Sequence, residues 1–589
     1  MTDNIYTLIR ERVLAALQAA VPDLPPELAA RVEVTPTRDP AHGDMATNAA
    51  LIAAKPARLP PAKIAAALAA ALAQAPEIAS AEPAGPGFVN LRLAPATLLA
   101  AIPAVLRAGE AFGASTTGHG KRINVEYVSA NPTGPMHVGH CRGAVVGDAL
   151  ANLLAKAGYA VTKEFYVNDA GNQVAALAWA SYWRYLESLG TALTEEEFAA
   201  SVPGGLQYRG DYLVPVGVKL AEAYGASLAG PDLTVGDPAS WLPVVRQFAI
   251  DAMLASIRID LAELGVTFDR FSSERELLES GAPDASIAKL QADGLLYQGV
   301  LEPPKGKLPD DWEPREQLLF RSTQFGDDVD RPLRKSDGTN TYFANDIAYH
   351  AAKAARSDVL IDVLGADHGG YVSRMKAATK AITGGTVLLE VVLCQIVRVM
   401  KGGEPVRMSK RAGTFITLSD LLEFVGRDAV RFTMLTRKSD AQMDFDIDAA
   451  VAQTRENPVF YVQYAHARCR SVLRAAADMP GISIDPAASL DSLQDEAELA
   501  VVRRMMGWPR TVEAAAEARE PHRIAFFLYD LAADFHMLWN RGREATTLRF
   551  LQPDNLAYTQ ARVALVASVA TVIRSGLQVM GVAPVEEMR

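Results

Sequence analysis

Cysteine is scarce in this 589-residue sequence, which has three, Cys141, Cys394 and Cys469, far apart along the chain. No pair has the two-residue spacing that is typical of zinc knuckles and thiol redox motifs. A disulfide framework would also need several cysteines within a short secreted domain. We therefore expect neither zinc nor a disulfide-stabilised fold.

The sequence also lacks a recognisable signal peptide or membrane span. Its first residues include Asp3 and Glu11 and have no basic region leading into an apolar core, so they predict an amphipathic helix instead. The longest alanine- and leucine-rich run, at residues 64–73, is too short to cross a bilayer and is soon followed by Pro76. We expect a cytoplasmic protein that makes no membrane contact.

Positive charge is in deficit over the chain as a whole. There are 58 basic and 69 acidic side chains, which give a net charge of −11. Such a chain repels polyanions on average, which counts against nucleic acid as a partner unless the average conceals a basic face. The 49% hydrophobic and 22% charged residues are typical of a globular protein, and the length predicts three or four domains.

Residues 1–112 predict a small α/β domain. Apolar periods at residues 5–17 and 61–72 predict two helices, and the alternation within GPGFVNLRLAP predicts a strand that begins near Phe88. The sequence FGASTTGHGK then marks a boundary, because glycine, serine and threonine are typical of loops.

Residues 113–440 predict a larger α/β domain, and residues 441–589 predict an all-helical one. The segments of the larger domain are, in order, a buried strand with the sequence RINVEYVSA, a helix at 136–157, a mainly helical insertion at about 173–325, and strands at 359–364 and 387–399. The junction between the first strand and its helix carries the first chemical motif.

Two histidines follow this strand, within the sequence NPTGPMHVGH. Prolines stop the strand and a glycine permits a tight turn. His137 and His140 are three residues apart, so they lie on one face of the first helical turns, where unpaired backbone N–H groups attract phosphate. Gly139 has no side chain and allows a flat ring or a phosphate to approach the backbone.

These features predict a phosphate cradle with two donors for a transferring phosphoryl group. For a bare HxxH pair, the simpler interpretation is a capped helix with two surface histidines. A metal site is disfavoured, because histidine ligands commonly lie four residues apart and no nearby carboxylate completes a set.

A second motif is the basic, glycine-flanked segment VMKGGEPVRMSKRAGTF. Gly402 and Gly403 precede a concentration of charge at Arg407, Lys410 and Arg411. A mobile loop of this kind can close a lysine over a polyphosphate. Taken alone, such a segment is more often a solvated turn.

Together these motifs resemble those of a known enzyme family. NPTGPMHVGH resembles the HIGH signature of class I aminoacyl-tRNA synthetases, with Val138 at the variable place, and the flanking VEYVSANPTGP resembles the arginyl-tRNA synthetase version. RMSK resembles the KMSK signature of that class and follows HVGH in the required order. Arg407 replaces the first lysine, which keeps the charge but substitutes a planar fork for a point charge.

The resemblance extends over nearly the whole chain and is weakest in the insertion. GRDAVRF resembles the DALR signature of an anticodon-binding domain, with Val430 in the leucine place, and NPVFYVQYAHARCRSVLR resembles the first helix of that domain. YRGDYL and GPGFVNLRL also resemble arginyl-tRNA synthetase segments, the latter from a tRNA-contacting N-terminal domain.

The resemblance implies a fold and an activity. The expected fold is α/β, with a doubly wound parallel-sheet catalytic domain of the Rossmann type, a small N-terminal α/β domain and an all-helical C-terminal domain. The expected reaction activates L-arginine with ATP, releases pyrophosphate, and transfers arginine to the 3′-terminal adenosine of its tRNA. Mg²⁺ is expected on the ATP phosphates, and the protein is expected to be a monomer that does not bind DNA.

The resemblance also implies roles for residues of the two motifs. The expected catalytic residues are His137, His140 and Lys410. The expected ATP contacts are these three residues together with Gly139, Met400, Arg407, Met408 and Ser409.

Arginine is a planar cation with five donors, so carboxylates are its best partners. The four-residue spacing from Tyr342 to Asp346 resembles that of the substrate-side-chain site in arginyl-tRNA synthetases, as does the spacing from Glu126 to Asn131 in the first strand. We expect both acids to bind the guanidinium or ammonium group, with Asn131 and Tyr342 as hydrogen-bonding neighbours. His368 in VLGADHGGY is a further arginine-site candidate, with contact to the nucleotide or support of its loop as alternatives.

The C-terminal region is much less acidic than the rest of the chain. From residue 455 onward there are 15 arginines, no lysine and 16 acids. Arginine can stack on bases as well as pair with phosphates. Tyr461, Tyr464 and Arg468 recur near helical spacing and predict contacts to unpaired tRNA bases, with core tyrosines and a solvated arginine face as the alternative.

Three other functions share part of this pattern. Another class I synthetase would carry both motifs, but Glu126 and Asp346 disfavour a neutral or apolar amino acid. A small-molecule nucleotidylyltransferase can share the HxGH turn but does not need RMSK and a large helical domain. A non-catalytic tRNA-binding relative should have lost His137, His140 or Lys410, and all three are present.

Overall fold

The structure is a computed structural model that describes residues 4–37, 39–301, 316–335, 337–406 and 416–588. The chain divides into two compact units. The first contains Met1–Thr117, Lys156–Gly158 and Ala452–Arg589, and the second contains Gly118–Ala155 and Tyr159–Val451.

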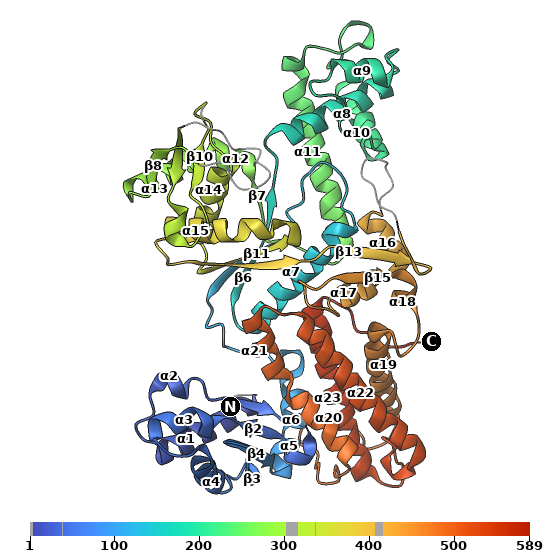
Figure 1. Ribbon diagram of the computed structural model, residues 1–589. Helices are drawn as coiled ribbons and strands as arrows, with labels where there is room; N and C mark the ends of the chain where they lie inside the picture. The colour runs from blue at the N-terminus through green and yellow to red at the C-terminus, as the bar shows by residue number, and fades with distance from the viewer. Residues whose placement is uncertain (1–3, 38, 302–315, 336, 407–415, 589) are drawn as a thin grey trace. The chain divides into compact units, whose positions relative to one another are not determined.

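A five-stranded parallel sheet forms the centre of the second unit (Figure 1). Its strand order is β12 (Leu388–Cys394), β11 (Val359–Gly365), β5 (Arg122–Glu126), β6 (Ala160–Val167) and β7 (Arg270–Ser273). The chain runs outward from β5 through β6 and β7, then returns to the other side of β5 as β11 and β12. The predicted doubly wound fold is confirmed, and its switch point lies between β5 and β11, where such sheets bind nucleotides.

Helices connect and cover the strands of this sheet. α7 (Val138–Lys156) joins β5 to β6, α14 (Tyr342–Ala354) precedes β11, and α15 (Val372–Ile382) joins β11 to β12. α7 approaches the chain after β5 closely, because a Cβ added to Gly147 would lie 2.3 Å from the ring of Tyr127. A glycine at this position therefore allows the helix to pack on the sheet.

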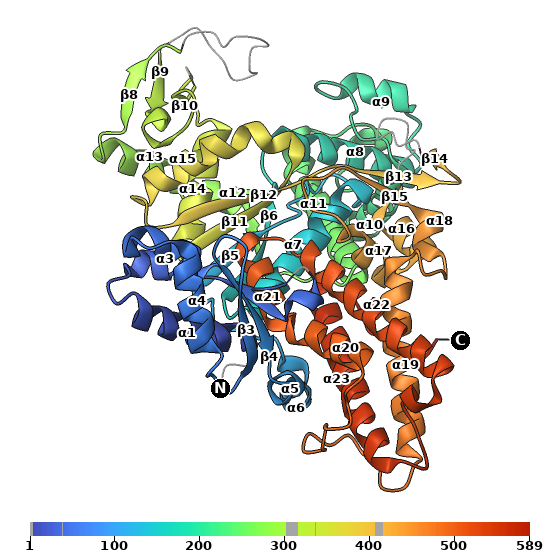
Figure 2. The ribbon, with the colours of Figure 1, turned by 60° about the horizontal axis from the view of Figure 1, so that its bottom comes forward.

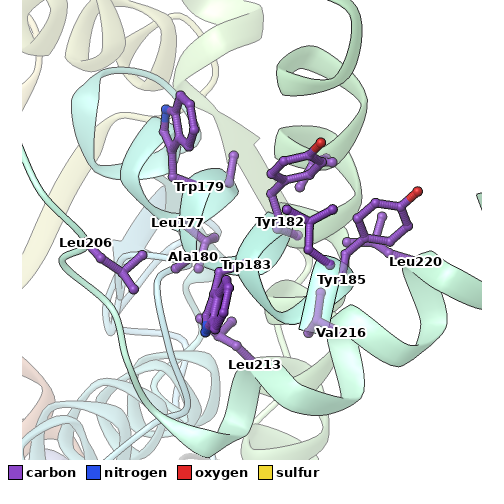
Figure 3. Close-up of a cluster of buried hydrophobic side chains, with 14 of the residues drawn as sticks. Leu177, Trp179, Ala180, Tyr182, Trp183, Tyr185, Leu206, Leu213, Val216 and Leu220 are labelled. Atoms are coloured by element: carbon purple, nitrogen blue, oxygen red, sulfur yellow. The ribbon is translucent and has the colours of Figure 1, made fainter. Parts of the chain in front are cut away.

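A helical insertion with an aromatic core follows β6. Its helices are α8 (Asn172–Leu189), α9 (Glu195–Ser201), α10 (Val214–Tyr224) and α11 (Pro238–Glu263). Figure 3 shows Trp179, Tyr182 and Trp183 of α8 within this core. Tyr182 stacks on Trp241 with ring centroids 3.7 Å apart, and Trp179 meets Trp241 edge-on at 4.7 Å.

Strands also lie within the range of the predicted insertion, because β7 follows α11 and joins the main sheet. A separate antiparallel sheet follows, with the order β10 (Arg331–Arg334), β9 (Gln317–Phe320) and β8 (Leu296–Gly299). Each of these strands has four residues, which is too short for a clear alternating pattern. α12 (Glu274–Glu279) and α13 (Ala282–Ala292) lie between β7 and β8 in sequence.

The predicted single strand at 387–399 is two strands in different sheets. β12 ends at Cys394, whereas β13 (Val397–Lys401) pairs with β14 (Glu404–Pro405) and β15 (Met443–Asp446). The buried Arg142 guanidinium donates to the carbonyls of Gln395 at 3.2 Å and Ala441 at 2.7 Å, which fixes this break. The remaining helices of the unit are α16 (Leu418–Val425), α17 (Arg427–Met434) and α18 (Ile447–Val451).

The N-terminal part of the first unit contains a four-stranded antiparallel sheet. Its order is β1 (Val34–Pro36), β2 (Met45–Thr47), β4 (Phe88–Leu93) and β3 (Ile78–Ala84). The helices of this segment are α1 (Ile5–Ala20), α2 (Pro26–Ala29), α3 (Ala49–Ala57), α4 (Pro61–Leu72), α5 (Pro95–Leu99) and α6 (Ala101–Ala108). The predicted helices at 5–17 and 61–72 and the strand near Phe88 are confirmed as α1, α4 and β4.

Helices make up the C-terminal part of the same unit. They are α19 (Pro458–Ala477), α20 (Glu496–Met506), α21 (Trp508–Ala518), α22 (His522–Glu544) and α23 (Leu556–Met580), and α19, α22 and α23 lie side by side in Figures 1 and 2. α23 is long and apolar enough to cross a membrane, with a mean hydropathy of 1.6, but 83% of its most apolar window is buried inside the protein. This apolar helix is longer than the run at residues 64–73, which is too short to span a membrane. Packing against neighbouring helices accounts for its apolar composition.

Candidate active site

The predicted histidine motif lies at the switch point, after the carboxyl end of β5. The strand ends at Glu126, earlier than the sequence predicts, because Val128 and Ser129 adopt positive φ values of 68° and 40°. A residue of the helical insertion stabilises the turn that follows: the Tyr212 hydroxyl donates a hydrogen bond to the Thr133 carbonyl at 2.8 Å. This tyrosine belongs to YRGDYL, so that segment supports the turn.

His137 and His140 stack on each other, with ring centroids 4.0 Å apart. The Gly139 amide donates a hydrogen bond to His137 Nδ1 at 3.1 Å, and the His137 amide donates one to His140 Nδ1 at 3.3 Å. A Cβ on Gly139 would lie 2.8 Å from His137 Cε1, so the flat ring that this glycine admits is that of His137. The structure therefore brings both predicted histidines together at the start of α7.

Two other segments fix the backbone of this turn. Buried Asp260 of α11 accepts a hydrogen bond from the Met136 amide at 3.2 Å, and burial raises the pKa of Asp260. On another side, Val138 N donates to Ile416 O at 3.3 Å, and Leu418 N donates to Met136 O at 3.0 Å. The chain that leaves the RMSK segment is thus hydrogen-bonded to the histidine turn.

The structure describes only some of the residues predicted to contact ATP from the second motif. Arg407, Met408, Ser409 and Lys410 lie outside the described residues. Met400 is half-buried in β13, within the small sheet that leads toward the loop. Its contact with ATP stays a prediction.

Carboxylates gather around the side chain of Tyr166, near the end of β6. The phenol oxygen is buried and has no hydrogen-bond partner among the residues that the structure describes. Burial raises the pKa of Tyr166, and nearby acids raise it further, namely Glu274, Asp346, Glu126 and Asp169. A buried phenol that faces several carboxylates is typical of a site for a cation with several donors.

Two of these acids have pKa values close to neutral pH. Burial raises the pKa of Asp346 to about 6, although the Tyr371 hydroxyl donates a hydrogen bond to it and opposes the rise. Burial likewise raises the pKa of Glu274 to about 6, and the charges of Asp346 and Asp169 add to the effect. A bound cation would favour the ionised forms of both acids.

The residues predicted to bind arginine are not all equally enclosed. Glu126 is buried, and its charge acts on the half-buried Asp346, so these two belong to one group. Tyr342 begins α14 as predicted, but its side chain is 70% exposed. His368 is also exposed, with Nε2 3.8 Å from an Asp367 oxygen. Asn131 accepts a hydrogen bond from Asn168 Nδ2 at 2.9 Å.

Sequence reasoning did not single out Tyr166 or Glu274. Both stand at carboxyl ends of strands in the parallel sheet, because Tyr166 is near the end of β6 and Glu274 directly follows β7. The strand-end position was the available signal, but β7 has four residues and was not recognised as a strand.

Two of the three predicted RNA-contacting residues, Tyr464 and Arg468, border a cavity in the C-terminal helices. This cavity of about 840 Å³ is lined by four arginines and three aromatic rings: Arg468, Arg474, Arg543, Arg549, Tyr464, Trp539 and Phe550. The Arg468 guanidinium lies 4.1 Å from the Tyr464 ring centroid and donates to the Tyr464 hydroxyl at 3.0 Å. The cavity therefore offers stacking surfaces and fixed cations together.

Neighbouring contacts hold Arg468 and Tyr461 in place. Arg468 Nη1 donates to His536 Nδ1 at 2.9 Å, and His536 Nε2 donates to the Tyr461 carbonyl at 3.1 Å. Burial lowers the pKa of His536 to about 4, and the charge of Arg468 lowers it further, so the imidazole is neutral and can accept this bond. The Tyr461 ring lies 4.5 Å from the ring of His536 and 5.1 Å from that of Tyr529.

Three family models match this chain. The model described as the arginyl tRNA synthetase N terminal domain matches residues 7–93, and the class I (R) tRNA synthetase catalytic domain matches residues 101–190. The DALR anticodon binding domain matches residues 462–588.

Curated relatives are similar over their whole length. The arginine–tRNA ligase of Gluconobacter oxydans is 63% identical over 593 residues, which cover 100% of this chain and 98% of the relative. The arginine–tRNA ligase of Ruegeria pomeroyi is 56% identical and both chains are covered completely. Among solved structures, Thermus thermophilus arginyl-tRNA synthetase has the same fold, with a TM-score of 0.70, 21% identity, and coverage of 99% of this chain and 100% of that one.

Proposed function

This chain belongs to the class I arginyl-tRNA synthetase family, and from that premise we propose how its side chains carry out the reaction. It is an ATP-dependent arginine–tRNA ligase. In the first step, L-arginine and ATP give arginyl-adenylate and pyrophosphate. In the second, the arginyl group passes to the 3′-terminal adenosine of the cognate tRNA.

We propose that ATP binds at the start of α7. The amino-terminal N–H groups of this helix attract phosphate, and His137 and His140 lie beside them. Together with Lys410, the two histidines would stabilise the charge that grows as the arginine carboxylate attacks the α-phosphate in line. The other proposed ATP contacts are Gly139, Met400, Arg407, Met408 and Ser409.

Magnesium accompanies the ATP phosphates in this proposal. In the described parts of the chain, no group of three or more His, Cys, Asp or Glu side chains is arranged to hold a metal ion. The residues present do not fit a metal cage made by the protein alone. Phosphate oxygens and water, which Mg²⁺ commonly retains as ligands, would complete its coordination. No zinc is proposed.

The acidic group around Tyr166 is the proposed arginine site. The observation that carries this assignment is the buried phenol without a partner among the described residues, whose pKa is raised by carboxylates from β5, α12 and α14. A guanidinium offers five donors in a fixed plane, which matches several converging acids. Glu126 and Asp346 are the proposed principal partners, Glu274 is added to them, and Asn131, Tyr342 and His368 are proposed neighbours.

The arginine-lined cavity of the C-terminal helices is proposed to receive unpaired bases of the tRNA. Tyr464 and Arg468 line it, and Tyr461 lies on the same helix. Aromatic rings can stack on bases, and arginine can stack and pair with phosphate. This arrangement supports the assignment of Tyr461, Tyr464 and Arg468 to tRNA binding.

The remaining assignments concern organisation. We propose a tRNA-contacting domain at residues 1–112, a catalytic domain at 113–440 and an anticodon-binding domain at 441–589. We further propose that the protein acts as a cytoplasmic monomer, with tRNA as its only macromolecular substrate and with neither DNA nor a membrane as a partner.

A pyrophosphate-exchange assay over the amino acids, with and without arginine tRNA, tests the proposed function. We expect exchange with arginine when the tRNA is present, because the acidic site selects a cation with several donors. Exchange with another amino acid, and none with arginine plus its tRNA, would refute the assignment.

A further inference from the structure

Lys353 of α14 is fully buried directly behind the proposed arginine site. Its ammonium donates to Glu126 Oε2 at 2.6 Å and to Asp362 Oδ1 at 2.7 Å. On a third side it lies 4.7 Å from the centroid of the Tyr349 ring. The ammonium is thus enclosed by groups of the protein and does not reach solvent.

The sheet explains why a cation is needed at this place. Glu126 and Asp362 are register partners on the adjacent parallel strands β5 and β11, so their side chains leave the same face of the sheet. Both are buried, at 8% and 5% exposure. Two buried carboxylates this close repel each other strongly unless a cation lies between them.

Lys353 remains charged despite its burial. Burial alone would lower its pKa, but the carboxylates of Asp362 and Glu126 outweigh that effect and raise the pKa above its usual range. Lys353 and His350 together hold the pKa of Asp362 well below its usual range, against the effect of burial. The three side chains therefore share one positive and two negative charges.

Other hydrogen bonds complete the surroundings of both acids. Asp362 Oδ2 lies 2.8 Å from His350 Nε2, and Glu126 Oε1 accepts from the Ser129 hydroxyl at 3.0 Å. The charge of Glu126 also acts on Tyr166 and Asp346, the other groups of the proposed arginine site. Lys353 thus links a structural acid to an acid of the proposed substrate site.

We propose that Lys353 is a positioning residue for arginine recognition: it holds the Glu126 carboxylate in the place from which that carboxylate contacts the substrate. Lys353 does not touch arginine itself. The inference rests on the proposed assignment of Glu126 to arginine binding and adds the residue on which that contact depends.

A charge-matched pair of double variants tests this role in the full-length enzyme. Lys353→Met with Asp362→Asn removes one positive and one negative charge, so the net charge of the cluster is unchanged, while Glu126 loses its ammonium partner and keeps its hydrogen bond from Ser129. Lys353→Gln with Asp362→Asn has the same charge but keeps an N–H donor near Glu126. Asp362→Asn alone is the control, because it retains the ammonium.

The readouts are the KM values for arginine and ATP and the melting temperature. We expect the methionine variant to raise the arginine KM roughly 10- to 100-fold relative to Asp362→Asn, with the ATP KM changed less than about twofold. The glutamine variant should recover much of this loss. Three results would overturn the proposal. The arginine KM could be unchanged in the methionine variant, it could rise equally in both double variants, or it could rise together with the ATP KM.

Two further measurements cover the remaining outcomes. If the methionine variant does not fold, the Asp362→Asn variant provides the test. In that variant Glu126 is the only carboxylate paired with the ammonium, so the arginine KM should not exceed the parental value. A tenfold rise in the arginine KM would overturn the proposal. Glu126→Gln tests the underlying assignment separately. If that change leaves the arginine KM unaltered, Glu126 is not an arginine ligand. If it raises the KM and the methionine variant does not, only the role of Lys353 fails.

Discussion

At the scale of single residues, Gly139 is constrained by the imidazole ring of His137. Its added Cβ would lie 2.8 Å from Cε1 and 2.9 Å from Nδ1 of His137, so an alanine would displace the imidazole. Because His137 is proposed to stabilise transition-state charge, we expect Gly139→Ala to lower kcat for arginine-dependent pyrophosphate exchange by roughly 10²-fold.

Gly143 supplies the matched control for this change on the same helix. A Cβ at Gly143 meets nothing within 4 Å, so Gly143→Ala should leave the exchange rate near the parental value. Similar losses in the two variants would show that the space above Gly139 has no special importance.

If Asp346 binds arginine as proposed, it should make arginine binding depend on pH. Its pKa is raised by burial to about 6 in the ligand-free site, and the charges of Glu126, Lys353 and His350 adjust it. A guanidinium binds the ionised carboxylate, so affinity is present above pH 6 and is lost as the pH falls through that value. We expect the arginine KM to rise roughly fourfold between about pH 7.5 and 5.5 from this group alone, measured by steady-state exchange.

Asp346→Asn provides the comparison for the pH effect. It should raise the arginine KM at every pH and make its pH dependence shallower, with the remainder due to Glu274, whose pKa burial also raises to about 6. An arginine KM that is flat across this range in the parental enzyme would contradict the prediction.

At the scale of secondary-structure elements, the packing of α7 against the sheet determines where both histidines lie. A Cβ on Gly147 would lie 2.3 Å from the Tyr127 ring, which is itself buried. Overpacking of this kind costs about 1–3 kcal/mol, so Gly147→Ala should lower the free energy of unfolding by about that amount. Gly143→Ala, also within α7, should instead stabilise the helix by roughly 0.5–1 kcal/mol. Urea denaturation of the two variants would distinguish these effects, and a loss of stability in both would contradict them.

The elements that the sequence predicts correctly are those with a clear period. The long apolar periods of α1 and α4 and the β-branched β5 could be found because their pattern repeats within one element. The strands β7 to β10 have four residues each, and β12 and β13 are separated by only two residues but belong to different sheets. Their assignment depends on partners far along the chain, and no local pattern contains that information.

At the scale of the whole molecule, the distribution of charge matters more than its sum. The net charge of −11 opposes RNA binding, yet the C-terminal cavity presents four arginines with three aromatic rings. A partner held at selected places needs local cations and not an overall positive charge.

Arg468 tests this interpretation. We expect Arg468→Gln to raise the KM for tRNA roughly tenfold and to reduce the salt dependence of tRNA binding by about one unit of log–log slope. Arg455→Gln removes the same charge from a side chain that is 84% exposed, and should have a much smaller effect. Equal effects of the two variants would show that net charge, and not the cavity, governs binding.

The sequence by itself determined the family resemblance, the reaction it implies and the two motifs, because HVGH, RMSK and the helical C-terminal segment are local strings of residues. It also led to the prediction that Glu126 and Asp346 belong to one site. Tyr166, Glu274 and Lys353 were decided only by the tertiary structure. They come from β6, α12 and α14, which the crossover order of the sheet brings to the surroundings of Glu126 and Asp346. Their burial arises only when those elements pack together.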